Sequence, residues 1–211
     1  MSNNSTLGTT DLTGEAAEDQ PGKLIVVSGP SGSGKTTVLA QLLNTCPLPL
    51  TLSVSATTRP PRPGEIHGRE YWFLTDEEFR TKRSRGEFLE SKEVFGRGYW
   101  YGTLRQSVST GLREGKWVIL EIDVQGALSV LDYDPEAITI FIDAGSMETL
   151  ENRLRSRGTE TEEVIQRRLE VAREEMGLMH KYRHRVINHS VDASVTEICR
   201  LLCRYDTRIA S

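Results

Sequence analysis

The sequence predicts an α/β fold with a core of parallel β-sheet flanked by helices. Three short apolar, β-branched runs each lead into a segment with helical spacing of apolar residues: "KLIVVSG" (23–29), "KWVILEID" (116–123) and "AITIFID" (137–143). Strands that alternate with helices build a parallel sheet with helices on both faces. With 211 residues, 37% of them hydrophobic, the chain has the size of one globular domain.

Residues 1–22 are predicted to form a disordered acidic tail, and residues 23–211 the folded domain. The tail is small and polar, with four carboxylates and no basic residue, so burial cannot offset the cost of ordering it. Its charge equals the formal net charge of -4, which leaves the domain formally neutral. The domain therefore has no net positive charge of the kind that would indicate a nucleic-acid polymer as partner.

The sequence shows no clear targeting segment, membrane helix or cysteine motif. The tail lacks a basic start and an apolar run, and no later segment approaches the roughly 20 apolar residues of a membrane helix, so we expect a soluble cytoplasmic protein without a membrane partner. Cys46, Cys199 and Cys203 show neither CxxC nor Cys/His ligand spacing. Buried thiols are favoured over a metal or redox site.

The alternation of strands and helices breaks between residues 50 and 103. Short aromatic strands are predicted at 50–57, 69–75, 87–95 and 98–103, with one helix capped by Thr75 and Glu78, so this part is interpreted as a small mixed insert of about 54–106. Farther on, the charge-rich stretch 158–185 is typical of a solvated helix. A strand at 185–189 and a last helix that begins at Ser194, with Glu197 in a capping box, complete the prediction.

"GPSGSGKT" (29–36) fits the phosphate-binding pattern G-x-x-x-x-G-K-[ST] and lies between a predicted strand and a predicted helix. Its glycines let backbone N–H groups turn toward phosphate oxygens, and the helix adds its positive N-terminal dipole. Lysine reaches the β- and γ-phosphates, and the threonine hydroxyl is a ligand for Mg²⁺. The candidate triphosphate-binding residues are Gly29, Pro30, Ser31, Gly32, Ser33, Gly34, Lys35, Thr36 and Thr37.

Two carboxylates, Glu121 and Asp123, close the second core strand. At the carboxyl end of a strand beside the loop, such a group can order the magnesium shell. The alternative is that they only cap the following turn.

The stretch "TTRPPRPGEIHGREYW" (57–72) places Arg59 and Arg62 on a proline frame. Two such arginines suit a bidentate clamp on a second phosphate. The same residues also form a PxxP sequence, typical of a polyproline ligand for an SH3-like partner, and spacing alone leaves both readings open.

Several motifs in order make the chain resemble the guanylate kinase family: "GKLIVVSGPSGSGKTT", "SVSATTRPPRPGEIHGREYWF", "GEFLE", "YWYGT", "VILEIDVQG" and "RLRSRGTETEEVIQRRL". The resemblance implies a P-loop nucleoside monophosphate kinase fold with a GMP-binding insert and a helical lid of about 146–175. It also implies Mg²⁺-dependent transfer of the ATP γ-phosphoryl to GMP, giving ADP and GDP, in purine nucleotide metabolism.

The resemblance assigns roles by position. It implies that the GMP phosphate is held by Arg59, Arg62, Tyr71 and Tyr101, and that guanine is read by Ser55 and Glu90 beside Thr103. Guanine presents N1–H and N2–H₂ donors on one edge, which a carboxylate accepts. It also implies that Glu121 contacts GMP, that Arg153, Arg157 and Arg168 belong to the lid and close over the transferring phosphoryl group, and that Asn188 lies near adenine. Apart from the resemblance, we expect Mg²⁺ to be held by Thr36 and, through water, by Asp123.

Each of these residues also has a purely structural interpretation. Without the family, Glu90 is an ordinary strand residue facing solvent, the tyrosines are core aromatics, and the lid arginines form helix-face ion pairs with Glu151, Glu162 or Glu163. Glu121 departs from the aspartate that many members have there. No catalytic role falls to His67, His180, His184 or His189.

Two other functions are weighed: a non-catalytic interaction module of guanylate-kinase-like build, and a P-loop kinase of another acceptor, such as a ribose bisphosphate. The intact phosphate loop disfavours the first, and Glu90 disfavours the second. Both a monomer and a homo-oligomer stay open.

Overall fold

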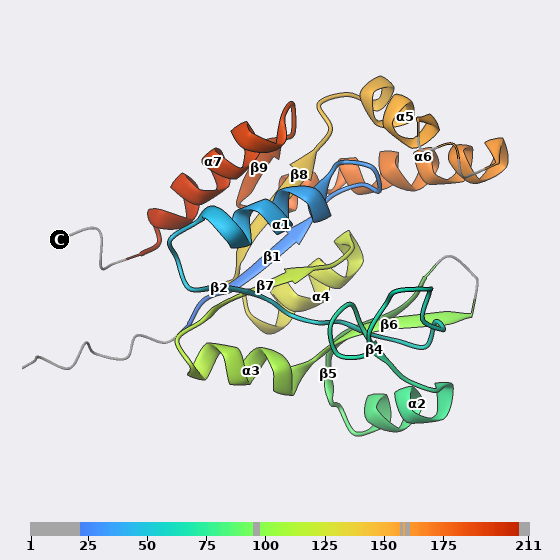
Figure 1. The fold of residues 1–211 in the computed structure, drawn as a ribbon, viewed down its shortest axis with the longest axis vertical. Coiled ribbons are helices and arrows are strands. Elements are labelled where there is room, and N and C mark those ends of the chain that lie inside the picture. Colours follow the sequence, from blue (N-terminus) through green and yellow to red (C-terminus); the bar gives the residue numbers. More distant parts are fainter. Residues whose placement is uncertain (1–21, 95–97, 157, 159–160, 207–211) are drawn as a thin grey trace, which may run out of the picture.

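The computed structural model describes residues 22–94, 98–156, 158 and 161–206. Its core is a five-stranded parallel sheet of order β2-β7-β1-β8-β9 (Figure 1). The strands are β1 (Leu24–Ser28), β2 (Leu50–Leu52), β7 (Trp117–Glu121), β8 (Ile138–Asp143) and β9 (His184–Ile187). The predicted α/β class with a parallel core is confirmed, whereas the predicted tail (1–22) lies almost wholly outside the described residues.

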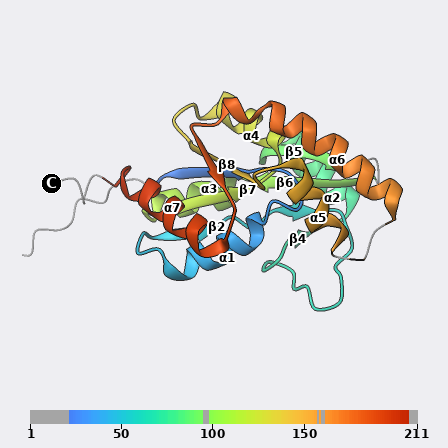
Figure 2. The ribbon, with the colours of Figure 1, turned by 90° about the horizontal axis from the view of Figure 1, so that it is seen from above.

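Both faces of the core sheet are covered by helices (Figure 2). Side chains alternate along β1, so that Ile25 and Val27 face one layer and Leu24 and Val26 face the other. The first layer holds α1 (Lys35–Thr45) and α7 (Val191–Cys203), and the second holds α3 (Arg105–Arg113), α4 (Val124–Tyr133) and the end of α6 (Glu162–Gly177). Burial on both faces explains why the core strands are continuous apolar runs.

A second, mixed sheet has the order β4-β3-β6-β5. Its strands are β3 (Ala56–Thr57), β4 (Trp72–Phe73), β5 (Phe88–Val94) and β6 (Tyr99–Leu104). Helix α2 (Asp76–Ser84) packs on it through Phe79, whose ring stacks on Phe88 at 4.4 Å. The predicted capping box of Thr75 and Glu78 is present at the start of α2.

A helical hairpin projects from the core on the same side as this sheet (Figure 1). It joins α5 (Met147–Arg155) to α6 around a separate apolar cluster that includes Leu150, Leu154, Ile165 and Leu169. The charge-rich stretch is therefore a helix with one buried face, not a solvated helix throughout. A short 3-10 helix, η1 (Met179–Lys181), leads from α6 toward β9.

Two sequence-based expectations are wrong, and one helix was not expected at all. The last helix begins at Val191, and Ser190 caps it by accepting from Ala193 N; Ser194 lies one turn inside the helix and is buried. Segment 50–57 is divided between the two sheets, because β2 pairs with β7 in the core. Helix α3 was not expected, since its sequence "RQSVSTGLR" has few apolar residues.

The remaining surface features are modest. Among the described residues, no helix is long and apolar enough to span a bilayer, and no group of three or more His, Cys, Asp or Glu side chains has a metal-binding arrangement. Cys46, Cys199 and Cys203 are free thiols, partly buried against the apolar cluster between α1 and α7.

Candidate nucleotide-binding site

The phosphate loop connects β1 to α1, as its motif predicts. Gly34 precedes the helix with a φ of 93°, a conformation that favours glycine, and a Cβ there would lie 2.3 Å from Asn188 Nδ2. Lys35 Nζ donates to the carbonyl oxygens of Gly29 (2.6 Å) and Pro30 (3.1 Å). The lysine thus folds back across the loop whose N–H groups would meet phosphate oxygens.

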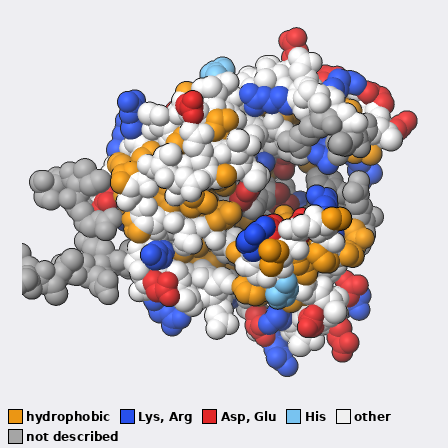
Figure 3. All heavy atoms as spheres, viewed as in Figure 1, with side chains coloured by type: hydrophobic (Ala, Val, Ile, Leu, Met, Phe, Trp, Pro, Cys, Tyr) orange, Lys and Arg blue, Asp and Glu red, His pale blue; other side chains and the backbone are white. Residues whose placement is uncertain are grey.

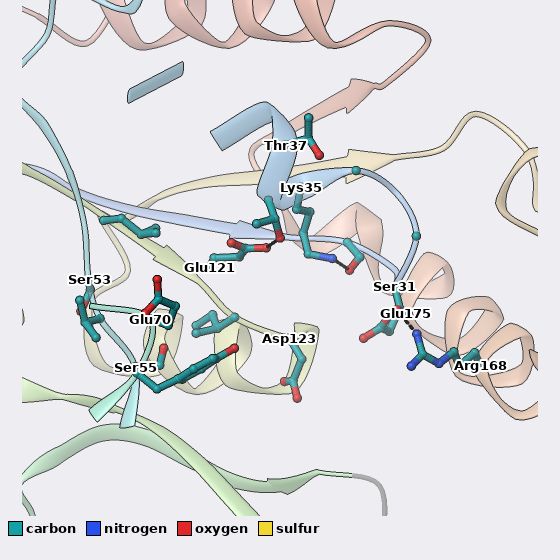
Figure 4. A pocket seen from close by; sticks show the side chains of 18 of the residues that line it. Ser31, Lys35, Thr37, Ser53, Ser55, Glu70, Glu121, Asp123, Arg168 and Glu175 are labelled. Atoms are coloured by element: carbon teal, nitrogen blue, oxygen red, sulfur yellow. Dashed lines mark hydrogen bonds between the residues drawn. The ribbon is translucent and has the colours of Figure 1, made fainter. Parts of the chain in front are cut away.

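The end of β7 supplies a carboxylate to the loop. Parallel pairing places Glu121 beside Val27 of β1, and Thr36 Oγ1 donates to Glu121 Oε1 at 2.7 Å (Figure 4). Asp123 instead caps α4, with Oδ1 accepting from Gly126 N at 2.8 Å, while its Oδ2 lies 3.1 Å from Lys92 Nζ.

The donor chemistry at this point fits Mg²⁺. The paired hydroxyl and carboxylate of Thr36 and Glu121 are hard oxygen ligands, and Mg²⁺ is usually held by one or two carboxylates together with substrate phosphates. Both residues line the same cavity as the phosphate loop. The Asp123 carboxylate, by contrast, is already used by a backbone N–H and a lysine.

A cavity of about 650 Å³ extends from the phosphate loop to Ser55 and Tyr71 of the insert. A smaller hollow of about 330 Å³ adjoins it and shares Ser55, Tyr71 and Glu121 in its wall. In the space-filling view the surface is hollowed between the helical hairpin and the second sheet (Figure 3). The two hollows form a continuous site bounded by both sheets and by α6.

The proline-framed arginines do not behave alike. Arg59 Nε donates to Tyr101 Oη (3.3 Å), and its guanidinium lies over the Tyr71 ring at 5.4 Å. The Tyr71 and Tyr101 rings meet edge to face at 5.7 Å. Arg62 has an exposed side chain on the next turn, so the structure brings together Arg59, Tyr71 and Tyr101 but not the Arg62 guanidinium.

Glu90 points away from bulk solvent into the smaller hollow, as does Ser55. Pairing of β5 with β6 sets Glu90 opposite the buried Thr103, whose hydroxyl donates to Glu90 Oε1 at 2.7 Å. Burial raises the pKa of the Glu90 carboxyl above its ordinary value, while the Thr103 hydrogen bond opposes this. The reading of Glu90 as a solvent-facing strand residue is therefore wrong.

The hairpin arginines reach the phosphate loop. Arg168 Nη1 donates to Ser31 Oγ at 3.0 Å, and Arg153 donates to the carbonyl oxygens of Asn188 (2.7 Å) and Ser33 (3.3 Å). The helix-face ion pairs with Glu151 and Glu162 belong to Arg155 instead. Arg157 lies outside the described residues.

Asn188 braces the loop from behind. It is 4% exposed, its Nδ2 donates to Ser33 O at 2.8 Å, and its Oδ1 accepts from Ser194 Oγ at 3.1 Å. The described contacts therefore give Asn188 a supporting position, and its proximity to adenine stays a prediction. The histidines take no part in the cavity wall: His67, for example, packs its ring edge against Trp72 at 5.2 Å.

Sequence reasoning missed three carboxylates of the site: Glu70 lines the larger cavity, Glu174 lines the smaller hollow, and Glu175 lines both. Glu175, on α6, lines both hollows and lies near Ser31 and Arg168 (Figure 4). Burial raises its pKa to about 7, and the Asp123 charge adds to this while the Lys35 charge opposes it. The available signal was helical spacing, because Glu175 follows Arg168 by seven residues and Val171 by four, on one helix face.

A phosphate loop at the carboxyl end of a parallel sheet, opposite a second polar site, defines a P-loop nucleotide-binding protein of the nucleoside monophosphate kinase fold. The family model described as guanylate kinase matches residues 21–205, and the chain belongs to that family. This confirms the resemblance drawn from the motifs.

Individual relatives agree along most of their length. The chain is 59% identical over 184 residues to a guanylate kinase of Rhodopirellula baltica, covering 86% of this chain and 88% of the relative. It is 46% identical over 189 residues to one of Caldanaerobacter subterraneus subsp. tengcongensis, with 88% and 90% covered. The crystal structure of guanylate kinase from Anaplasma phagocytophilum superposes with a TM-score of 0.71 at 31% identity, covering 89% of this chain and 88% of that one.

Proposed function

We propose that the chain transfers the γ-phosphoryl group of ATP to GMP, giving ADP and GDP. The observation that carries this is that an intact phosphate loop and a Glu90–Thr103 pair open into one continuous site. One side suits a triphosphate, and the other suits a base that presents two adjacent N–H donors. Family membership at up to 59% identity supports the same activity.

The residues divide into donor, acceptor and lid groups. On the donor side, the loop amides and Lys35 hold the β- and γ-phosphates. On the acceptor side, in an insert of about 54–106, Arg59, Tyr71 and Tyr101 hold the GMP phosphate, with Arg62 completing the clamp when the turn that carries it closes on the nucleotide. Guanine is read by Glu90 and Ser55.

The lid, of about 146–175, contributes positive charge. Arg153 and Arg168 already touch the loop through Ser33 and Ser31, so a small closing movement brings them to the transferring group. Arginine at that position stabilises charge on the equatorial oxygens of the transition state and is worth about 10³ to 10⁵ in rate. We place Arg157 in the same set by position in the motif.

Mg²⁺ would be held by Thr36 and the substrate phosphates, with Glu121 and, through water, Asp123 around it. When bound, it neutralises charge on the β- and γ-oxygens. The protein's own part is to align donor and acceptor and exclude water, because phosphoryl transfer needs positioning and charge neutralisation more than a strong base.

The other two functions lack support in the site. A peptide-binding module does not need Lys35, Thr36 and two arginines set around an intact loop. The separate interpretation of residues 60–63 as a PxxP ligand is disfavoured because Arg59 is folded inward onto Tyr101. A kinase of another acceptor does not need a half-buried carboxylate paired with Thr103 in the acceptor hollow.

One assay tests the proposal. ADP formation from ATP is measured with GMP, AMP, UMP and dTMP in turn, by a coupled spectrophotometric readout. We expect turnover with GMP to exceed the others by at least about 10³, since sites built on paired hydrogen bonds discriminate by roughly 10⁴ to 10⁵. Turnover with another monophosphate but not with GMP would refute the assignment of the acceptor.

A further inference from the structure

Glu65 lies in the loop between β3 and β4 and is bound at both carboxylate oxygens. Its Oε1 accepts from Arg59 Nη2 at 2.9 Å, and its Oε2 accepts from the backbone N–H of Arg62 at 2.7 Å. The Arg59 and Glu65 side chains are only 11% and 17% exposed. The Arg59 guanidinium and the Arg62 N–H hold the pKa of this carboxyl below its ordinary value, so it is charged at neutral pH.

The local sequence explains how Glu65 reaches both partners. Glu65 N donates to Arg62 O at 3.0 Å, which closes a four-residue turn with Pro63 and Gly64 at its centre. Proline followed by glycine with a positive φ, here 89°, is the signature of a type II turn. The carboxylate at the last position of this turn therefore folds back on its first residue and reaches across to Arg59.

The contact fixes the orientation of the Arg59 guanidinium. A guanidinium has five N–H groups in one plane, and the described contacts use three of them: Nη2 to Glu65, Nη1 to Pro60 O at 2.7 Å, and Nε to Tyr101 Oη at 3.3 Å. The same plane lies over the Tyr71 and Phe73 rings. Two N–H groups remain for a phosphate oxygen, in a plane that has little rotational freedom left.

The orientation of Tyr101 follows from Arg59. Because the Tyr101 oxygen accepts from Arg59 Nε, its own O–H proton must be directed to another acceptor. Tyr101 lines the acceptor hollow, where an anionic phosphate would provide one. Contacts thus run from Glu65 through Arg59 to Tyr101 and end at the acceptor hollow.

We propose that Glu65 is a positioning residue of the acceptor site, which holds Arg59 and Tyr101 in the orientation that binds a monoester phosphate. This rests on the proposed function. Glu65 lines neither hollow and binds Nη2 of Arg59, whereas Tyr101 meets Nε of the same guanidinium. It acts by lowering the orientational entropy that the clamp loses when the phosphate binds. The opposite role is a carboxylate that competes with the phosphate for Arg59, and its removal would tighten GMP binding.

The test is Glu65→Gln, with Glu87→Gln as the matched control. Glu87 pairs with Lys82 at 2.9 Å in the same insert and lines neither hollow, so its substitution removes an ion pair of the same length that is more exposed than the Arg59–Glu65 pair. In Glu65→Gln we expect the KM for GMP to rise about 10-fold or more, from loss of a hydrogen bond between charged groups. We expect kcat to fall less than about 3-fold and the KM for ATP to be unchanged; the control should match the parent chain throughout.

A double-mutant cycle separates positioning from general support of the fold. If Glu65 acts through Arg59, adding Glu65→Gln to Arg59→Lys should raise the KM for GMP by less than about 2-fold over Arg59→Lys alone. If it only stabilises the fold, the melting temperature and kcat would fall while the KM for GMP stays constant. That outcome, or an unchanged or lowered KM for GMP, overturns the proposal.

A second variant and a second measurement guard against misfolding. Glu65→Asp keeps the charge but is too short to reach both partners at once, so we expect a smaller rise in the KM for GMP than with Gln; an Asp variant equal to the parent chain overturns the two-partner argument. Calorimetry with GMP alone measures the same clamp without turnover. If the parent chain fails to phosphorylate GMP, the proposed function itself is overturned. If the parent phosphorylates GMP and Glu65→Gln has the same KM for GMP, only the role of Glu65 is overturned.

Discussion

Replacing Glu90 with Gln tests how the acceptor base is chosen. The substitution keeps the size of the side chain, and the remaining carbonyl oxygen can still accept from the Thr103 hydroxyl, which lies 2.7 Å from Glu90 Oε1. The other oxygen becomes an NH₂ group. A donor then faces the N1–H and N2–H₂ donors of guanine, where a carboxylate accepted from both.

The magnitude follows from the bonds that are lost. Each hydrogen bond to a charged group is worth about 1.5–3 kcal/mol, so losing both costs about 3–6 kcal/mol. At about 1.4 kcal/mol for each factor of ten, kcat/KM for GMP should fall by about 10² to 10⁴. The dissociation constant of ATP should change by less than about 2-fold, because Glu90 lines the smaller hollow and not the wall at the phosphate loop.

The assay is ADP formation at varied GMP, with ATP binding measured separately by calorimetry. Glu93→Gln is the control, because Glu93 is on the same strand with an exposed side chain. The direction of the pH effect adds a second check: burial raises the pKa of Glu90, and only the ionised form accepts from two donors. GMP affinity should therefore fall as the pH falls through that pKa, and this pH-dependent loss of affinity should be absent from the Gln variant.

Equal losses for ATP and GMP would show that the substitution damages the fold and would refute the base-reading argument. So would a parent-like kcat/KM for GMP in the Glu90→Gln variant.

Three further substitutions probe the loop and the buried carboxylate. Lys35→Ala should reduce kcat by at least about 10² to 10³ in the coupled assay with a melting temperature close to the parent's, since it removes one donor to the transferring phosphates. Gly34→Ala forces a Cβ to 2.3 Å from Asn188 Nδ2 at a φ of 93°, so it should destabilise the fold by about 1–3 kcal/mol in denaturant melts, whereas Gly177→Ala, where a Cβ would meet nothing within 4 Å, should not. Burial raises the pKa of Glu175 from 4.5 to about 7, so its contribution to stability is full below about pH 4.5 and is lost as the pH rises through 7. Between pH 5 and pH 8, the free energy of unfolding of Glu175→Gln should therefore rise relative to that of the parent by at most about 3 kcal/mol, and by less where cavity water screens the charge. A difference in unfolding free energy that does not vary with pH would refute this account.

The strands and the phosphate loop were predictable because their signals are local. Continuous apolar runs such as Leu24–Ser28 have one physical explanation, burial on both faces, and the glycine and lysine pattern that follows requires a specific backbone. The start of the last helix was not predictable in the same way. Ser190 and Ser194 are both suitable caps, and the choice depends on Asn188, which needs the Ser194 hydroxyl as a partner inside the helix.

The contacts that assemble the site are long-range, and this is why the sequence alone missed part of it. Asn188 meets Ser33 across 155 residues, and Arg168 meets Ser31 across 137. Such pairs carry no periodicity, so a polar residue that braces a loop looks the same as one that contacts a ligand. Glu175 was hidden for a related reason: in a charge-rich helix, one inward-facing carboxylate does not stand out until the packing of the helix is known.

Glu121 connects the two halves of the site. The register of β7 beside β1 places its Cα next to Val27, and its side chain then spans to Thr36 Oγ1 at 2.7 Å while also lining the acceptor hollow. An aspartate at this position would be one methylene shorter and could not make that bond without a shift of the backbone. The longer side chain of glutamate therefore lets this carboxylate contact Thr36 on the donor side. Because one carboxylate borders both the triphosphate side and the acceptor side, its charge acts on both nucleotides, and a change at Glu121 should alter donor and acceptor binding together where a change at Glu90 alters only one.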